Sequence, residues 1–188
     1  MNKIAIFASG SGTNASRLIS YFKSHKNISV ELVVCNNDKA LVLNKASESG
    51  VDTLLISKSE LQTSEKILSI LISKEINFIV LAGFLLKVPE WLIENYTNKI
   101  INIHPSLLPK YGGKGMYGHN VHKSVLENSE SESGITIHYV NKEYDKGQII
   151  YQAKCRVDKE DTIETLSEKI HKLEYESLPK VVEELLTK

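Results

Sequence analysis

The sequence predicts an α/β fold of the Rossmann-like, doubly wound type, with a mainly parallel sheet. Short apolar runs rich in β-branched residues alternate with helical patterns over most of the chain. A glycine-rich turn follows the first of these runs. Two further β-rich runs, joined by a short connector, predict an antiparallel C-terminal hairpin. A long C-terminal helical pattern follows this hairpin.

The alternation assigns an expected element to each apolar run. The expected strands are Lys3–Ala8, Val30–Cys35, Thr53–Ile56, Phe78–Leu81 and a run that begins at Ile100, and the expected hairpin strands are Gly134–Val140 and Gln148–Val157. The expected helices are a segment beginning at Ala15, then Leu41–Ser49, Glu65–Lys74, Glu90–Tyr96, His119–Glu127 and a last helix that Asp161 and Glu164 open as a capping box. Pro179 is expected to kink or restart that helix.

Length and composition predict one domain over residues 1–188, without a linker or repeat. The 23 basic residues balance the 23 acidic residues, which gives no electrostatic case for a nucleic-acid or membrane partner. Two cysteines, Cys35 and Cys155, form neither zinc spacing nor a disulfide framework. We therefore expect a cytoplasmic protein that binds small molecules and no metal, as a monomer or a homodimer.

The turn after the first strand, Ser9-Gly10-Ser11-Gly12-Thr13-Asn14, predicts a phosphate-binding site. Glycines let the backbone approach a ligand, and the free N–H groups at a helix N-terminus attract an anion. A plain tight turn capped by Thr13 or Asn14 is the alternative. The turn also fits the loose dinucleotide pattern G-x-G-x-x-G/A, but no single acidic residue ends the next strand as that pattern requires.

Two polar side chains, Asn102 and His104, interrupt the apolar run that begins at Ile100. Asn102 and His104 are two residues apart, so both project from one face of a strand. Pro105 ends the strand, which places the pair near its C-terminal end, where open α/β sheets bind ligands. The amide can donate to a developing oxyanion, and the imidazole can move a proton near neutral pH, which suits acyl transfer. The alternative is a pair of satisfied polar groups in the core.

Other candidate residues are weaker when considered from the sequence alone. The apolar segment Leu85–Val88 either lines a pocket for a flat ligand or packs against the next helix. The glycine-rich segment 111–118 is expected to be a loop able to close over substrate. Asp145 fits a turn residue at the hairpin tip. His171 and Glu174 share a helix face as a solvated pair, and His119 and His122 are expected at the surface, since they lack metal-pair spacing.

Taken together, the motifs resemble the folate-dependent formyltransferases over nearly the whole chain. The segment Asn102-Ile103-His104-Pro105-Ser106-Leu107-Leu108-Pro109 carries the resemblance to that superfamily, with Leu81-Ala82-Gly83-Phe84 and the segment from Gly134 to Gly147. Within that superfamily, the Gly12-Thr13-Asn14 loop makes the chain resemble the glycinamide ribonucleotide formyltransferases of purine synthesis. The resemblance thus implies formyl transfer from 10-formyltetrahydrofolate, as co-substrate, to the amine of glycinamide ribonucleotide.

The resemblance also assigns roles to residues. Gly12, Thr13 and Asn14 would hold the substrate phosphate, and Glu174 would contact the glycinamide. Asn102 and a protonated His104 would stabilise the oxyanion, and Asp145 would hold the imidazole and help to move the proton, with no covalent intermediate and no metal. The folate site, in the C-terminal part of the domain, would contain Leu85, Leu86, Lys87, Val88, Asn102, His138 and Val140. Lys87 lies one position later than the basic residue that the family often carries.

Three other functions compete with this interpretation. A hydrolase that deformylates 10-formyltetrahydrofolate shares the fold, but we expect it to carry an additional N-terminal domain. A methionyl-tRNA formyltransferase is expected to carry a C-terminal RNA-binding extension and a basic surface. A nucleotide-binding oxidoreductase or a nucleotide sensor would leave Asn102 and His104 without a task.

Overall fold

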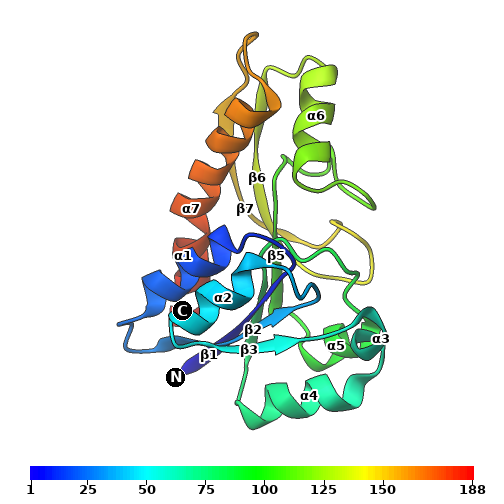
Figure 1. Cartoon of the computed structure of the whole chain (residues 1–188). Coiled ribbons are helices and arrows are strands. Elements are labelled where there is room, and N and C mark those ends of the chain that lie inside the picture. The colour runs from blue at the N-terminus through cyan, green and yellow to red at the C-terminus, as the bar shows by residue number, and fades with distance from the viewer.

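The structure is a computed structural model that describes residues 1–188, with the exception of the Ser64 side chain. Its strands form one seven-stranded sheet in the order β3-β2-β1-β4-β5-β6-β7 (Figure 1). The strands are β1 (Asn2–Ala8), β2 (Ile28–Cys35), β3 (Asp52–Leu55), β4 (Phe78–Leu81), β5 (Ile100–His104), β6 (Glu132–Tyr139) and β7 (Ile149–Arg156). Strands β1 to β5 pair in parallel, and β6 and β7 pair antiparallel. The predicted mainly parallel sheet with an antiparallel hairpin is confirmed.

Helices cover both faces of the sheet, as a doubly wound fold requires (Figure 1). Helices α1, α2, α6 and α7 pack on one face, around a core that contains Ile4, Ile6 and Leu18. Helices α3, α4 and α5 lie over the other face, around Phe7, Leu71 and Leu92. The helices are α1 (Thr13–Phe22), α2 (Leu41–Glu48), α3 (Lys58–Gln62), α4 (Ser64–Ser73), α5 (Glu90–Asn95), α6 (His119–Glu127) and α7 (Ile163–Thr187).

The strand order reverses between β1 and β4. From β1 the chain moves outward to β2 and β3, and then returns to place β4 on the other side of β1. In open α/β sheets, the crevice at such a reversal, at the carboxyl ends of the strands, binds ligands. The chain segments that leave β1, β4 and β5 all begin at this crevice, and they carry most of the residues that the sequence nominates for the site.

The expected capping box of the last helix is wrong, and of the two effects expected at Pro179 the restart is absent. The N-cap is Thr162, which forms a capping box with Thr165, rather than Asp161 with Glu164. Helix α7 also continues through Pro179 without a restart. A proline leaves the carbonyl four residues earlier without its helical donor, and here that carbonyl, on Tyr175, accepts a hydrogen bond of 3.3 Å from Nε of Arg17 in α1. The tertiary contact with α1 therefore replaces the bond that the proline removes.

Candidate active site

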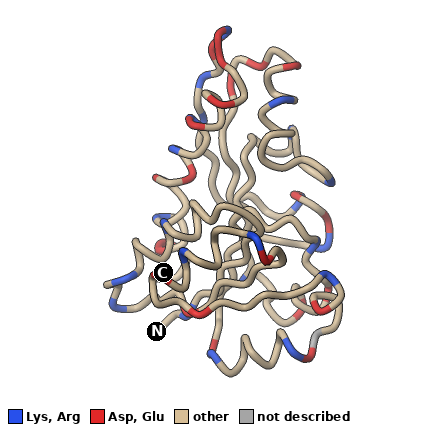
Figure 2. Tube along the Cα trace, viewed as in Figure 1, with Lys and Arg blue, Asp and Glu red and all other residues tan. Residues whose placement is uncertain are grey.

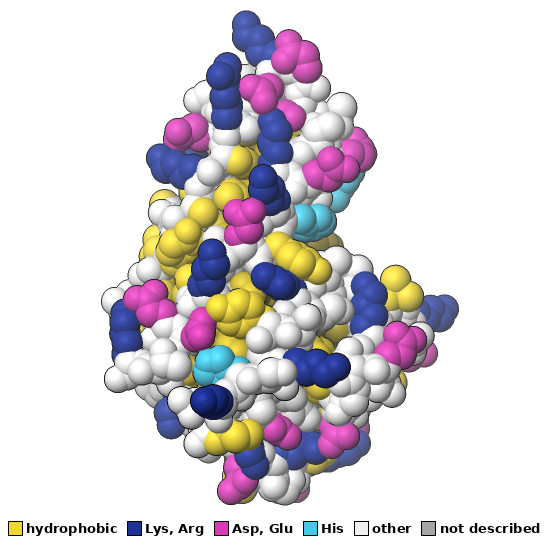
Figure 3. Space-filling view, turned by 90° about the vertical axis from the view of Figure 1, so that its left-hand side faces the viewer, with side chains coloured by type: hydrophobic (Ala, Val, Ile, Leu, Met, Phe, Trp, Pro, Cys, Tyr) yellow, Lys and Arg dark blue, Asp and Glu magenta, His cyan; other side chains and the backbone are white. Residues whose placement is uncertain are grey.

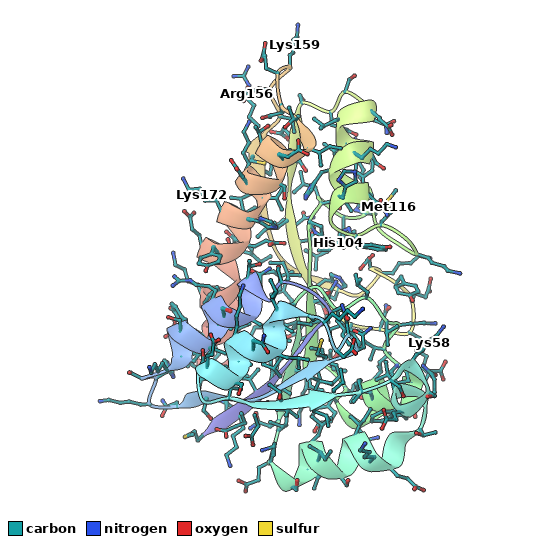
Figure 4. The ribbon with its side chains drawn as sticks, in the orientation of Figure 1. Lys58, His104, Met116, Arg156, Lys159 and Lys172 are labelled. Atoms are coloured by element: carbon teal, nitrogen blue, oxygen red, sulfur yellow. The ribbon has the colours of Figure 1, made fainter. Side chains whose placement is uncertain are left out.

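One cavity of about 570 Å³ opens at the strand-order reversal. Its lining combines the glycine turn after β1, the segment after β4, the end of β5, the glycine-rich loop before α6, Asp145 and part of α7. Figure 4 labels His104 and Met116, and both lie beside this opening. The predicted catalytic and phosphate-binding residues thus meet in one space, although they come from distant parts of the chain.

The glycine turn leads directly into α1 without a side-chain cap. Gly12 is the N-cap with φ of 72°, and no side-chain hydrogen bond caps the helix. A Cβ at Gly12 would lie 2.5 Å from Cγ2 of Val42, so both its backbone angle and its neighbour require glycine. The expected alternative, a cap by Thr13 or Asn14, is wrong. The N–H groups at the start of α1 are therefore available to an anion in the cavity.

Asn14 instead reaches across the cavity to the C-terminal helix. Its Nδ2 donates to Oε2 of Glu174 at 2.9 Å. Glu174 is only 8% exposed, so the expected solvated pair with His171 is wrong. Burial raises the pKa of Glu174, and the hydrogen bond from Asn14 offsets part of the increase. A carboxylate and an amide therefore face each other beside the phosphate-binding turn.

Asn102 and His104 lie at the end of β5, and β-strand alternation places them on the same face. His104 is 4% exposed, and its Nε2 donates to the carbonyl oxygen of Tyr111 at 2.7 Å. In the neutral ring Nδ1 is then unprotonated, and it lies 3.6 Å from Oδ2 of Asp145. Burial lowers the pKa of His104 below its ordinary value, and the charge of Asp145 opposes this decrease only in part. Burial thus favours the neutral ring, with an unprotonated Nδ1, over the protonated ring that the resemblance implies for the reaction.

Asp145 connects the catalytic candidates to the glycine-rich loop. It has a left-handed backbone with φ of 54°, in the connection between β6 and β7. Its Oδ2 accepts from the backbone N–H of Gly113 at 2.8 Å. Burial raises its pKa, but the contact with His138, the nearby His104 and the Gly113 amide outweigh burial, so the pKa is lowered overall. Asp145 is thus a carboxylate held in place by contacts on several sides, and the predicted plain turn residue is only part of its role.

The amide of Asn102 already has two hydrogen-bond partners. Its Nδ2 donates to Nε2 of His138 at 3.1 Å and to Oδ1 of Asp145 at 3.4 Å. Nδ1 of His138 donates to the carbonyl oxygen of Tyr139 at 2.8 Å, which leaves Nε2 as the acceptor. To donate to an oxyanion, Asn102 must release one of these two partners.

A smaller cavity of about 70 Å³ adjoins the first one. It contains most of the residues predicted for the folate, namely Leu86, Lys87, Val88, Asn102, His138 and Val140. Leu85 differs, because it is 50% exposed and lines the larger cavity instead. Nζ of Lys87 lies 5.9 Å from the ring centroid of Tyr144, a residue that borders both cavities. The two cavities meet at Asn102 and Asp145.

Comparison with known proteins assigns this site to a family. The profile of the family described as "Formyl transferase" matches residues 2–182. The chain belongs to the formyl transferase family. It is 34% identical over 191 residues to the phosphoribosylglycinamide formyltransferase of Bacillus subtilis, covering 99% of this chain and 95% of that protein. The crystal structure of phosphoribosylglycinamide formyltransferase from Bacillus halodurans has a TM-score of 0.90 and 33% identity, with 100% of this chain and 96% of that chain covered.

A plant relative is longer than this formyl transferase. The chain is 36% identical over 192 residues to the chloroplastic phosphoribosylglycinamide formyltransferase of Arabidopsis thaliana. The match covers 97% of this chain but 66% of the plant protein. About one third of the plant protein therefore lies outside the part that matches this chain.

The structure adds a residue of this formyl transferase that the sequence did not nominate. His122 was expected at the surface, but it is 3% exposed and lines the larger cavity from α6. Its Nδ1 has no hydrogen-bond partner among the described residues. Burial, together with His171 and His119, lowers its pKa to about 4. The sequence held one signal for this burial. Val121 and Val125 are spaced to lie on the buried face of α6, and His122 follows Val121 directly, so its side chain lies at the edge of that face.

The surface of this formyl transferase shows mixed charge. Basic and acidic residues alternate along the chain and on the face viewed in Figure 3, without a large patch of one sign (Figures 2 and 3). Within the described residues, no helix is long and apolar enough to cross a membrane. No group of three or more His, Cys, Asp or Glu side chains among them is arranged to hold a metal ion.

Proposed function

We propose that this chain transfers the formyl group of 10-formyltetrahydrofolate to the amine of glycinamide ribonucleotide, in purine biosynthesis. One observation carries the proposal. The Gly12 turn, Glu174 and the group of Asn102, His104 and Asp145 all line one cavity of about 570 Å³. The names of the Bacillus relatives support the same reaction and the same amine substrate.

The proposed ribonucleotide lies along the larger cavity. Its phosphate accepts hydrogen bonds from the backbone at Gly12, Thr13 and Asn14, where the positive end of the α1 dipole adds attraction. Its glycinamide lies near Glu174, whose carboxylate is fixed by Asn14. This orientation directs the amine toward the end of β5, where His104 lines the same cavity.

The proposed reaction is direct attack. The amine nitrogen forms a bond to the formyl carbon, and the carbonyl electron pair moves to oxygen. Collapse of this adduct reforms the carbonyl and breaks the bond to N10 of the folate. The proton that the amine loses is returned to N10. No enzyme bond forms, so the protein acts by orientation, proton transfer and stabilisation of the oxyanion.

The neutral form of His104 fits the role of the group that carries this proton. A neutral imidazole with an unprotonated Nδ1 can accept the proton of the attacking amine, and the imidazolium then forms beside Asp145. The new positive charge also stabilises the oxyanion. Asn102 contributes a second donor when it exchanges His138 or Asp145 for the oxyanion. Both interactions become strong only as charge develops, which is what catalysis requires.

The proposed folate binds where the two cavities meet. Its pterin contacts Leu86 and Val88, with His138 and the backbone from Val140 to Asp145 on the other side. Leu85 borders the reacting end, and Lys87 is available to a carboxylate of the folate tail. We further propose that residues 1–188 act as one domain in the cytoplasm, where Cys35 and Cys155 stay reduced, with a metal-free site.

A direct assay tests the proposal. Purified protein is mixed with 10-formyltetrahydrofolate, and the folate absorbance change is followed with and without glycinamide ribonucleotide. We expect turnover only when the ribonucleotide is present, and none with His104→Ala. Turnover without the amine would identify a deformylating hydrolase and would contradict the proposal. Binding of a nicotinamide dinucleotide without formyl transfer would favour the oxidoreductase.

A further inference from the structure

A separate cavity of about 360 Å³ lies next to the segment that follows β5. Its lining includes Ser106, Lys110 and Tyr111 from this segment, the chain before β6, and Gln152 and Lys154 of β7. Among the described residues, none lines both this cavity and the one that contains His104. The segment from residue 105 to 113 therefore separates two cavities.

The charges around this third cavity are balanced. Lys110 donates to Oε1 of Glu130 at 2.8 Å, and Lys154 donates to Oε2 of Glu132 at 3.1 Å. Two cations and two anions thus line one space. A ligand with a single charge would leave one sign unmatched, whereas a small molecule with both charges complements both pairs. The cavity volume is at the lower end of the range of about 300–1,000 Å³ for ligand sites, which suits a compact molecule.

Two features of β6 leave polar groups at this cavity. The β5–β6 register ends at His104 and Thr136, so residues 132–135 of β6 extend past the end of β5. Backbone groups on that edge of the strand lack a β5 partner. Ser133, within this stretch, is 2% exposed, and its hydroxyl has no hydrogen-bond partner among the described residues. This hydroxyl oxygen is closed to solvent, so the Ser133 side chain must rotate toward the cavity before a ligand can supply the missing partner.

Tyr111 contacts both cavities. Its hydroxyl donates to Oε1 of Glu130 at 2.9 Å, at the charged wall of the third cavity. Its backbone carbonyl accepts from Nε2 of His104 at 2.7 Å, in the active site. A ligand that draws Glu130 away from Tyr111 would therefore change the position of the group that holds His104.

We propose that this third cavity binds a small zwitterion of the free α-amino acid class, and that its occupancy is transmitted through Tyr111 to His104. The ligand carboxylate contacts Lys110 and Lys154, and its ammonium contacts Glu130 and Glu132. The unpaired groups of β6 serve as further hydrogen-bond partners. This site is distinct from the proposed formyl transfer, and it stands or fails independently of that reaction.

Binding is tested on the full chain by two-dimensional NMR of backbone amides. Glycine, alanine and serine are titrated to millimolar concentration, with acetate and methylammonium as single-charge probes. We expect a zwitterion to shift the amides of Ser131 and Ser133 and to bind at least about fivefold more tightly than either probe. The absence of shifts with all three amino acids would overturn the proposal, as would equal binding of acetate.

An exposed charge reversal gives a second test. Lys154→Glu removes an attraction for the ligand carboxylate and adds a repulsion, so affinity should fall by about fivefold or more. Lys123→Glu is the matched control, because Lys123 lies on α6 and pairs with Glu127 outside the cavity. Equal affinity in wild type and Lys154→Glu would contradict the proposed contact.

The coupling to His104 has its own readout. In wild type, we expect a saturating amino acid to shift the imidazole resonances of His104. Tyr111→Phe keeps the backbone carbonyl but removes the hydroxyl bond to Glu130, so the amino acid should still bind while the His104 shift is lost. Unmoved His104 resonances in the occupied wild type would overturn the coupling.

Discussion

Nδ1 of His104 lies 3.6 Å from Oδ2 of Asp145, with both side chains largely withdrawn from solvent. The opposite ring nitrogen is occupied by Tyr111, so the next proton that the ring accepts goes to the atom that faces the carboxylate. Burial lowers the pKa of His104 and Asp145 raises it, with burial the larger effect. In the proposed reaction, the pair would therefore take up a proton as the amine attacks.

Replacement of Asp145 by asparagine should move the pH profile of the reaction. The neutral ring is the proposed active form, so kcat/KM falls as pH decreases through the lowered pKa of His104. Asp145→Asn removes the charge that raises this pKa, and the acid limb should therefore move to lower pH, with a slower reaction throughout. Rates from pH 5 to 8, with NMR titration of His104, measure the change. Asp38→Asn, at an exposed residue, is the control, and an acid limb at higher pH would refute the assignment.

Asn102→Ala should reduce turnover by about 10²–10³-fold, the usual loss when one oxyanion donor is removed. Because the same amide bonds His138 and Asp145, His138 should also become more mobile. Steady-state assays give the first effect, and NMR relaxation of the imidazole gives the second. Asn128→Ala, in an exposed position at the end of α6, serves as control. Turnover near that of wild type would exclude the oxyanion role.

Gly12→Ala should destabilise the protein and weaken ribonucleotide binding more than folate binding. An alanine there combines a left-handed φ of 72° with a Cβ only 2.5 Å from Val42, at a cost of about 2 kcal/mol. Gly50→Ala, outside the cavity, is the matched control, since Gly50 has a similar φ of 76° but a Cβ there meets no atom within 4 Å. Urea unfolding and calorimetric titration of each substrate measure the two effects. A loss confined to folate affinity would contradict the phosphate site.

The buried His122 should make the protein less stable in acid. Its folded-state pKa of about 4 is below the ordinary value of 6.5, so the unfolded chain binds more protons between these values. The stabilisation is therefore complete above pH 6.5 and is lost as pH falls toward 4, by up to about 3 kcal/mol.

Two variants isolate this contribution. His122→Phe removes the titrating group, so the decrease in unfolding free energy between pH 7 and pH 5 should become smaller. His119→Phe, at an exposed residue of the same helix, removes only the smallest of the three causes of the lowered pKa, so it should leave most of the decrease in place. Urea unfolding at the two pH values is the measurement. An undiminished decrease in His122→Phe would show that other groups dominate.

The predicted elements follow from local signals that the tertiary structure leaves intact. The strand around Asn102 and the turn at Gly12 have the expected form, because β-branched apolar runs and glycine turns act over a few residues. The same local reasoning failed at the Asp161 cap, and it did not foresee that the helix continues through Pro179. Competing caps one residue apart differ little in energy, and an outside donor, Arg17, replaces the helical bond lost at Pro179.

The amino-acid sequence by itself determined the doubly wound, mainly parallel fold class and the face shared by Asn102 and His104, because the period of a strand fixes that face. The resemblance placed Asp145 and Glu174 in the same site, but only the tertiary structure decided the contacts that hold them and the burial of His122. It also decided that burial outweighs the charge of Asp145 and lowers the pKa of His104. The physical reason is that burial and charge-to-charge distance arise between segments far apart in the chain, and these two quantities set both the pKa values and the partners of the site.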